Sequence, residues 1–169
     1  MGVPAAPHSE NVQLFMTMLM RYPEVASLHY DAEEGLIRFT FLCRQVEEEE
    51  LRDLEGTIRE SLDAFFLLED LPPGIFALKA DTIEDITVLE LERDVETLTL
   101  REISLLIALV SDRLEGRLLT EMAGPWFEGE DPWQQEEFME SLLDDLRRSK
   151  GRQRWIAYRE EGRVFVFRQ

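Results

Sequence analysis

The sequence predicts an α+β protein, with a mainly antiparallel sheet built from three β-hairpins and about four helices packed on one face. Six short segments alternate apolar and polar residues, and they occur in neighbouring pairs separated by turn-forming loops. Between these pairs lie longer stretches in which apolar residues recur every three or four positions, as in amphipathic helices. The predicted order is therefore α-ββ-α-ββ-α-α-ββ, and pairing within local hairpins makes the sheet mainly antiparallel.

The predicted hairpins each join two alternating segments across a short loop. In the first, Ile37, Phe39 and Cys43 fall on one face and Arg38 falls on the other. Gly35 suits the left-handed position of the loop that precedes them. The strands are expected at residues 26–31 and 36–44, 75–80 and 86–93, and 155–158 and 164–167, with loops at 32–35, 81–85 and 159–162.

The helices are expected at residues 9–21, 47–68, 99–122 and 131–150. The third helix is the most apolar of the four. Its start has the pattern of a capping box, with Thr99 as the N-cap and the Glu102 side chain reaching back to the Thr99 amide. Because polar residues enter its second half, we expect the helix to be buried over its N-terminal half and to emerge toward Trp126.

The last predicted helix carries start and stop signals at both ends. Pro132 occupies the first position, where its missing N–H costs nothing. Arg147, Arg148 and Lys150 lie in the last turn, and Gly151 follows them. Its buried face is expected to consist of Phe138, Met139, Leu142, Leu143 and Leu146.

Length and composition favour a single folded domain, residues 9–169, after a flexible lead at residues 1–8. The 169-residue chain is 44% hydrophobic, which is enough apolar material for a core despite a net charge of −18. It has no uncharged apolar run of about 18 residues and no signal-peptide pattern, so no membrane contact is expected. A single cysteine, Cys43, excludes an intramolecular disulfide framework and fits the cytoplasm.

The charge is distributed unevenly along the chain. Eight of the 18 Lys and Arg residues lie in residues 146–169, which contain only two acids, so the rest of the sequence is strongly acidic. An acidic body repels polyanions over most of its surface. The basic C-terminal segment is therefore either a local anion site or a partner for carboxylates.

The residue types that catalysis and metal binding need are scarce. His8 lies in the expected lead and His29 faces away from the apolar side of its strand, so a Ser-His-Asp arrangement has little support. Cys and His together number three, too few and too far apart for a zinc site. Glu90 and Glu92 could hold a divalent cation, but with 36 acids such pairs arise by chance. We therefore predict no catalytic residue, no metal site and no cofactor.

The first candidate site is an aromatic loop between glycines and prolines, which contains Trp126, Phe127 and Trp133. Aromatic residues in such a loop either plug the end of a core or form a binding surface. The core plug is the preferred interpretation. If the loop is a site instead, it would bind a protein partner or line a pocket for a small molecule or a divalent ion.

The second candidate site is a basic surface formed by Arg147, Arg148, Arg152 and Arg154 together with Trp155. Basic groups interleaved with aromatic rings suit single-stranded nucleic acid. The acidic body opposes such a ligand, so docking on an acidic surface, within the chain or across a dimer, is preferred over nucleic acid.

These observations favour a non-enzymatic cytoplasmic interaction or regulatory protein that acts through protein–protein contacts and forms a homodimer. A basic protein is the partner that its acidity suggests. Two alternatives stay open: a ligand-binding domain or enzyme with a pocket near residues 126–133, and nucleic-acid contact through the basic C-terminal hairpin.

Overall fold

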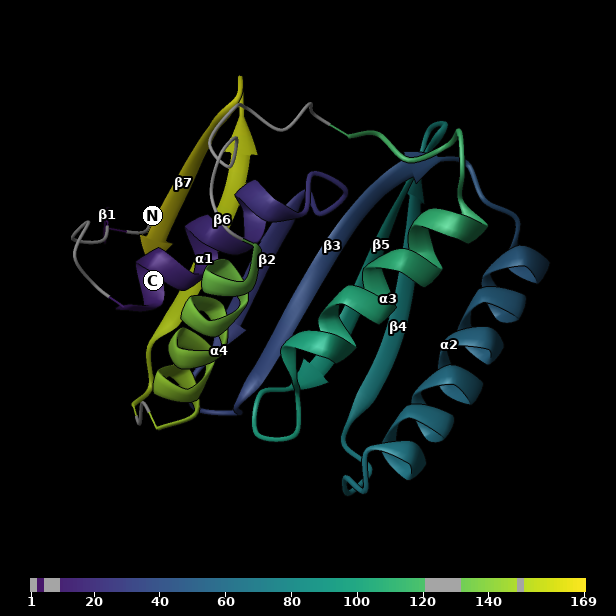
Figure 1. Ribbon diagram of the computed structural model, residues 1–169. Helices are drawn as coiled ribbons and strands as arrows, with labels where there is room; N and C mark the ends of the chain where they lie inside the picture. Colours follow the sequence, from purple (N-terminus) through teal and green to yellow (C-terminus); the bar gives the residue numbers. More distant parts are fainter. Residues whose placement is uncertain (1–2, 5–9, 121–131, 149–150) are drawn as a thin grey trace.

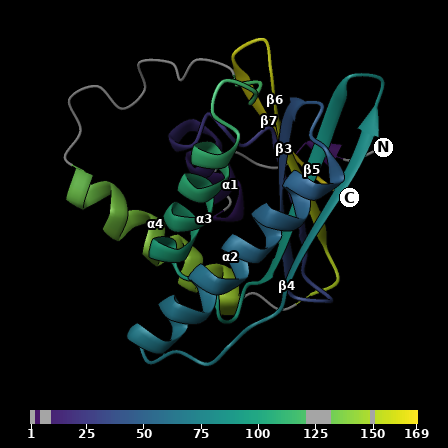
Figure 2. The same cartoon turned by 90° about the vertical axis from the view of Figure 1, so that its right-hand side faces the viewer.

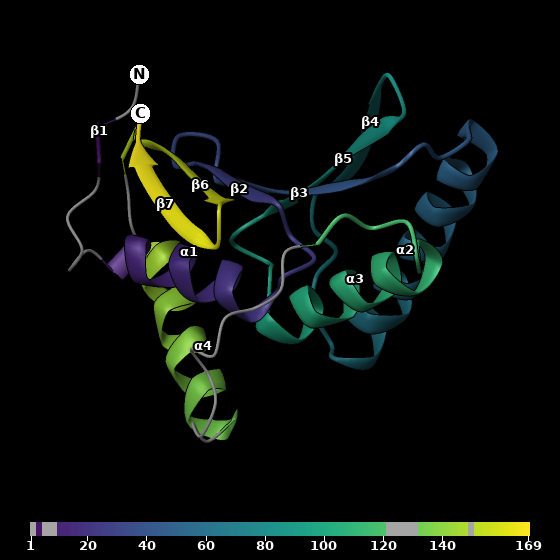
Figure 3. The same ribbon diagram turned by 90° about the horizontal axis from the view of Figure 1, so that it is seen from above.

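The computed structural model describes residues 3–4, 10–120, 132–148 and 151–169, and in these residues a sheet and a layer of helices form two layers (Figures 1 and 3). The described strands are β1 Val3–Pro4, β2 Ser27–Asp31, β3 Leu36–Arg44, β4 Phe76–Ile83, β5 Ile86–Asp94, β6 Arg154–Glu160 and β7 Arg163–Arg168. They form one sheet in the order β1-β7-β6-β2-β3-β5-β4, with antiparallel pairing throughout. The predicted α+β class and the order of helices and hairpins are confirmed.

The described helices are α1 Glu10–Arg21, α2 Glu48–Leu68, α3 Leu100–Arg113 and α4 Pro132–Arg148. They all lie on one side of the sheet, as Figure 3 shows. The α1 and α4 helices pack together over β2, β6 and β7, while α3 lies over β3 and β5 and packs against α2 (Figure 1). Among the described residues, no helix is long and apolar enough to cross a membrane.

The first hairpin lies at the centre of the sheet. Its strand β3 pairs with β5 of the second hairpin, and its strand β2 pairs with β6 of the third. Alternation along each strand then separates two faces: on β5, Thr87, Leu89, Leu91 and Arg93 are buried beneath the helices. We call the opposite side, which no described helix covers, the helix-free face.

The third helix is shorter than the sequence predicts. The expected range was 99–122, but α3 ends at Arg113, and the Leu114 N–H donates to the Val110 carbonyl oxygen at 3.0 Å. Gly116 then takes a φ of 78°, a left-handed conformation that turns the chain. Leu118 lies beyond the helix and forms an isolated β-bridge with Cys43. The expected helical path toward Trp126 is therefore wrong.

Smaller corrections concern three other segments. Residues 81–83 were predicted as loop but continue β4, so that Glu84 and Asp85 alone form the turn, with Glu84 at a φ of 60°. Phe138 was predicted to be buried but is 48% exposed, because the N-terminal half of α4 projects away from the sheet (Figure 2). In the expected lead, Val3 and Pro4 pair with β7.

A buried ion pair joins the second hairpin to the third helix. The Arg93 guanidinium donates to both carboxylate oxygens of Glu102, at 2.5 and 2.7 Å, and both side chains are 0% exposed. Glu102 therefore does not reach back to the Thr99 amide as predicted, although the Thr99 hydroxyl does accept from the Glu102 N–H at 3.2 Å. A bidentate pair with this geometry fixes the angle between β5 and α3.

The remaining donors of Arg93 reach further segments of the chain. They bond to the Ile75 carbonyl oxygen at 2.7 Å, to the Thr97 hydroxyl at 3.1 Å and to the Asp94 carboxylate. Gly74 passes so close that a Cβ there would lie 2.0 Å from the Thr97 hydroxyl oxygen. The cluster thus holds together the start of β4, the end of β5 and the loop before α3.

Replacing Glu102 by alanine is expected to lower the free energy of unfolding by about 3–5 kcal/mol, because the Arg93 charge would stay buried without its counter-ion. Urea denaturation followed by circular dichroism measures the change. The control is Arg101→Ala, which removes an exposed pair with Glu69 at 3.3 Å and should cost about 1 kcal/mol or less. Equal losses of unfolding free energy in the two variants would contradict the stabilising role of the buried pair. The double replacement Arg93→Met with Glu102→Leu should recover part of the loss, since apolar side chains need no partner.

The stability of the protein is expected to fall in acid partly through Asp94. Burial opposes ionisation of this carboxyl, but donation from the Thr97 hydroxyl, the Arg93 charge and the Ile75 N–H together lower its pKa. A lowered pKa contributes stability above the unfolded value of about 3.9, and this contribution is lost as pH falls through the folded value. The Asp94→Asn variant should therefore show a shallower loss of stability than the wild type below about pH 4. Parallel pH profiles of urea midpoints would contradict this role.

Candidate interaction surface on the helix-free face

An aromatic patch lies on the helix-free face, at the end of the sheet formed by β6 and β7. Strand alternation places Trp155 and Ala157 beneath the helices, which leaves Ile156 and Tyr158 on the helix-free face. Phe165 and Phe167 share that face, because Tyr158 pairs with Phe165 and Ile156 pairs with Phe167. We define the aromatic patch as Tyr158, Phe165 and Phe167.

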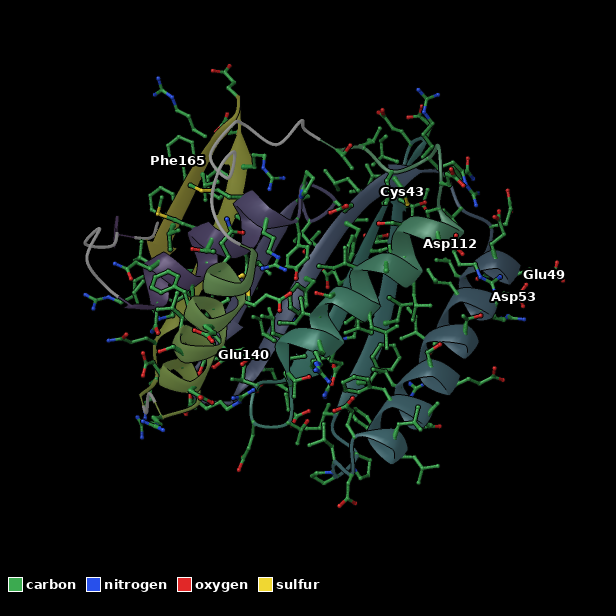
Figure 4. The ribbon with its side chains drawn as sticks, in the orientation of Figure 1. Cys43, Glu49, Asp53, Asp112, Glu140 and Phe165 are labelled. Atoms are coloured by element: carbon green, nitrogen blue, oxygen red, sulfur yellow. The ribbon has the colours of Figure 1, made fainter. Side chains whose placement is uncertain are left out.

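The three rings of the patch stack on one another. Tyr158 lies 5.5 Å from Phe165 and 5.9 Å from Phe167, between ring centroids, and all three interplanar angles are 23° or less. All three side chains remain partly exposed. Figure 4 shows Phe165 on β7, on the opposite side of the molecule from Glu49 and Asp53 of α2. Aromatic residues are enriched in protein interfaces, and an uncovered cluster of them indicates a contact surface.

A polar hollow adjoins the patch. His29 pairs with Ile156 across β2 and β6, so the hollow begins one residue away from the aromatic rings. Its volume is about 330 Å³. The residues that line it are His29, Tyr30, Asp31, Glu34, Leu36, Arg38, Glu92, Arg154, Trp155 and Gln169.

The charges in the hollow are paired with one another. Arg38 lies 3.2 Å from Glu92, and Arg154 lies 3.2 Å from Asp31. Burial lowers the pKa of His29, and the neighbouring Arg38 lowers it further, so the imidazole is neutral at pH 7. The hollow therefore offers hydrogen-bonding groups and already satisfied ion pairs.

The groups that could act as nucleophiles in and near the hollow are few and buried. No Ser, Thr or Cys side chain is among its lining residues, and the one hydroxyl group there belongs to Tyr30, which is 4% exposed and whose pKa is raised by burial and by the neighbouring Asp31. Within the part of the chain that the structure describes, no group of three or more His, Cys, Asp or Glu side chains could hold a metal ion. Cys43 is buried at the far end of β3, and burial raises the pKa of its thiol, which makes it a poor nucleophile.

The first predicted site cannot be placed. Trp126 and Phe127 lie outside the described residues, and so does the side chain of Trp133. The interpretation of this loop as a core plug or a binding surface stays a prediction.

The predicted basic surface is not one surface. Arg148 and Arg152 are exposed, and Arg154 points to the helix-free face and lines the hollow. Arg147 instead bonds to the carbonyl oxygens of the loop before α3. Trp155 is 6% exposed and packs in the core, because alternation along β6 turns it away from Arg154.

Two arginines of the basic segment bind backbone carbonyl groups of the same chain. Arg147 donates to Val95 at 3.2 Å and also to Leu98, which ties α4 to the loop that precedes α3. Arg159 donates to Val25 at 2.9 Å and to Leu19 at the C-terminal end of α1, where carbonyl groups lack helical partners. Arg147 and Arg159 of the basic segment therefore stabilise the fold through these hydrogen bonds.

Sequence analysis missed Phe165 and Phe167 as site residues. The signal was present, because the run of residues 164–167 is apolar on both faces of its strand. Such a run indicates burial on both sides, or an exposed apolar surface where only one side is covered. Here Val164 and Val166 pack against the core and the two phenylalanines form the other face.

Comparisons with known proteins give no match: no family model fits the chain, and no curated protein or solved structure is significantly similar to it.

Replacing Phe165 by alanine is expected to lower the free energy of unfolding by only about 1–2 kcal/mol, since its ring contacts lie on an uncovered face. The matched core variant Phe39→Ala, at a side chain 3% exposed, should cost about 3–5 kcal/mol. Urea denaturation of both variants tests the assignment. Equal costs would show that Phe165 belongs to the core and is not available for binding.

Proposed function

We propose that this protein is a non-enzymatic interaction protein of the cytoplasm, a homodimer that binds another protein through the aromatic patch and the polar hollow. The observation that supports this most is the stack of Tyr158, Phe165 and Phe167 on a sheet face that no described helix covers. Large rigid rings supply most of the contact energy in protein interfaces, and a neighbouring polar hollow gives specificity.

The partner that fits this surface presents apolar side chains beside basic groups. Glu90 and Glu92 share the helix-free face with the patch, and the chain carries a net charge of −18. Opposite charge on a partner speeds encounter and excludes acidic competitors. Arg38 and Arg154 are engaged by carboxylates of the chain, which leaves less positive charge for an acidic partner.

Nucleic acid is the second candidate, and one arrangement favours it. Arg154 lies on the same face as the stacked rings, and arginine beside exposed aromatic rings is a common single-strand binding surface. The carboxylates of Asp31, Glu90 and Glu92 on that face repel phosphates. We therefore favour the protein partner.

The test is affinity capture with the full chain carrying a tag, from an extract of the organism that makes it. The double variant Phe165→Ser with Phe167→Ser should lose the captured proteins, because the ring contacts are removed. The variant Phe138→Ser should keep them, since Phe138 is an equally large exposed side chain on α4, 48% exposed.

Retention of every captured protein by the patch variant would contradict the proposal. Capture that nuclease treatment abolishes, and that weakens steeply with salt, would favour nucleic acid instead.

A further inference from the structure

The outer edge of β4 is the long unpaired edge of the described sheet. β4 pairs with β5 on one side, and no described strand lies on its other side. Residues 79–83 are all exposed, and a hollow of about 230 Å³ separates Leu78, Lys79 and Ala80 from the first turns of α2. At the other end of the sheet, β1 is only two residues long. Unpaired N–H and C=O groups along an extended edge are a template for another strand.

We propose that β4 pairs antiparallel with β4 of a second copy of this chain, about a twofold axis at Ala80, so that the two sheets join into one. This inference deepens the proposed function and rests on its homodimer. It makes no use of the aromatic patch, which lies toward the opposite end of the sheet from β4 (Figure 1).

The twofold axis restricts the register. In an antiparallel pair, residues that lie directly opposite each other point to the same face of the sheet. A twofold axis between two residues of β4 would place neighbouring residues opposite each other, and neighbours point to opposite faces. The axis, which is perpendicular to the sheet, must therefore pass through a residue of β4. An axis at Lys79 would place the two copies of Lys79 opposite each other, and an axis at Asp81 would do the same for the two copies of Asp81. Like charges directly opposite each other are destabilising. An axis at Ala80 places Lys79 opposite the partner's Asp81, and this pair occurs twice.

The same register is favourable for the neighbouring positions. Ile83, which is 62% exposed, comes to lie opposite the partner's Ala77 and loses contact with water. At the axis the small side chain of Ala80 opposes its own copy, which lets the strands approach closely. Lys79 lies opposite Glu90 of β5 in the register of the sheet. In the dimer it would therefore lie between the carboxylates of Glu90 and of the partner's Asp81.

The first experiment is a cysteine cross-link. Opposite Cα atoms in an antiparallel pair are about 4.5–5.5 Å apart, within the range that a disulfide spans. The variant Ala80→Cys should therefore form a covalent dimer under mild oxidation, seen on a non-reducing gel. The matched control Ala77→Cys should not, because six residues of strand, about 20 Å, separate it from its own copy. Cys43 is buried and should not react.

The second experiment reverses one charge. Asp81→Lys would place a lysine opposite the partner's Lys79 at both symmetric positions, and the dissociation constant should rise at least about tenfold by analytical ultracentrifugation. The control Glu140→Lys makes the same change in charge on α4, an exposed position on the other side of the molecule (Figure 4). It should leave the dissociation constant unchanged.

The outcomes separate this inference from the proposed function. A wild-type chain that is monomeric at every concentration overturns both the β4 dimer and the proposed homodimer. A stable dimer in which Ala77→Cys cross-links as well as Ala80→Cys, or in which Asp81→Lys has no effect, overturns the β4 interface and leaves the homodimer standing.

Discussion

The ion pair between Arg93 and Glu102 is the interaction on which the arrangement of this fold most depends. Two fully buried charges are expensive to desolvate, and they are tolerated only when each finds its partners in good geometry. Arg93 achieves this by bonding to a helix, to the adjoining loop and to Ile75 at the start of β4. Gly74 is required beside it, because a side chain there would collide with the cluster. The position of α3 relative to the second hairpin is therefore fixed.

This pair holds α3 against one face of the sheet, and the opposite face carries the aromatic patch. Beneath the helices lies a continuous core, into which the only cysteine and one tryptophan, Trp155, are packed. On the helix-free face, strands β2, β3 and β5 lie between the aromatic patch and the edge strand β4. In the proposed function, the molecule self-associates at the β4 end of the sheet and holds a partner at the end formed by β6 and β7.

Strand alternation and helical spacing were enough to predict the α+β class and the hairpins, because those signals are local. The central place of the first hairpin was not predictable, since strand order depends on which edges meet after folding. The end of α3 was missed because apolar spacing continued beyond it, although Gly116 marked the turn. The buried pair left a signal, as Arg93 occupies an apolar-face position on its strand. The patch was missed because the aromatic rings of β7 were interpreted only as part of a basic hairpin.

Hydroxyl-radical footprinting of the full chain tests the central claim, that function resides on the helix-free face, most directly. The purified protein and the protein in an extract of its own organism are labelled in parallel, and oxidation is mapped by mass spectrometry. The account predicts that Tyr158, Phe165 and Phe167 lose reactivity in the extract, while Phe138 on α4 and Leu67 on α2 do not. Protection of Phe138 and Leu67, with the patch as reactive as in the purified protein, would contradict it.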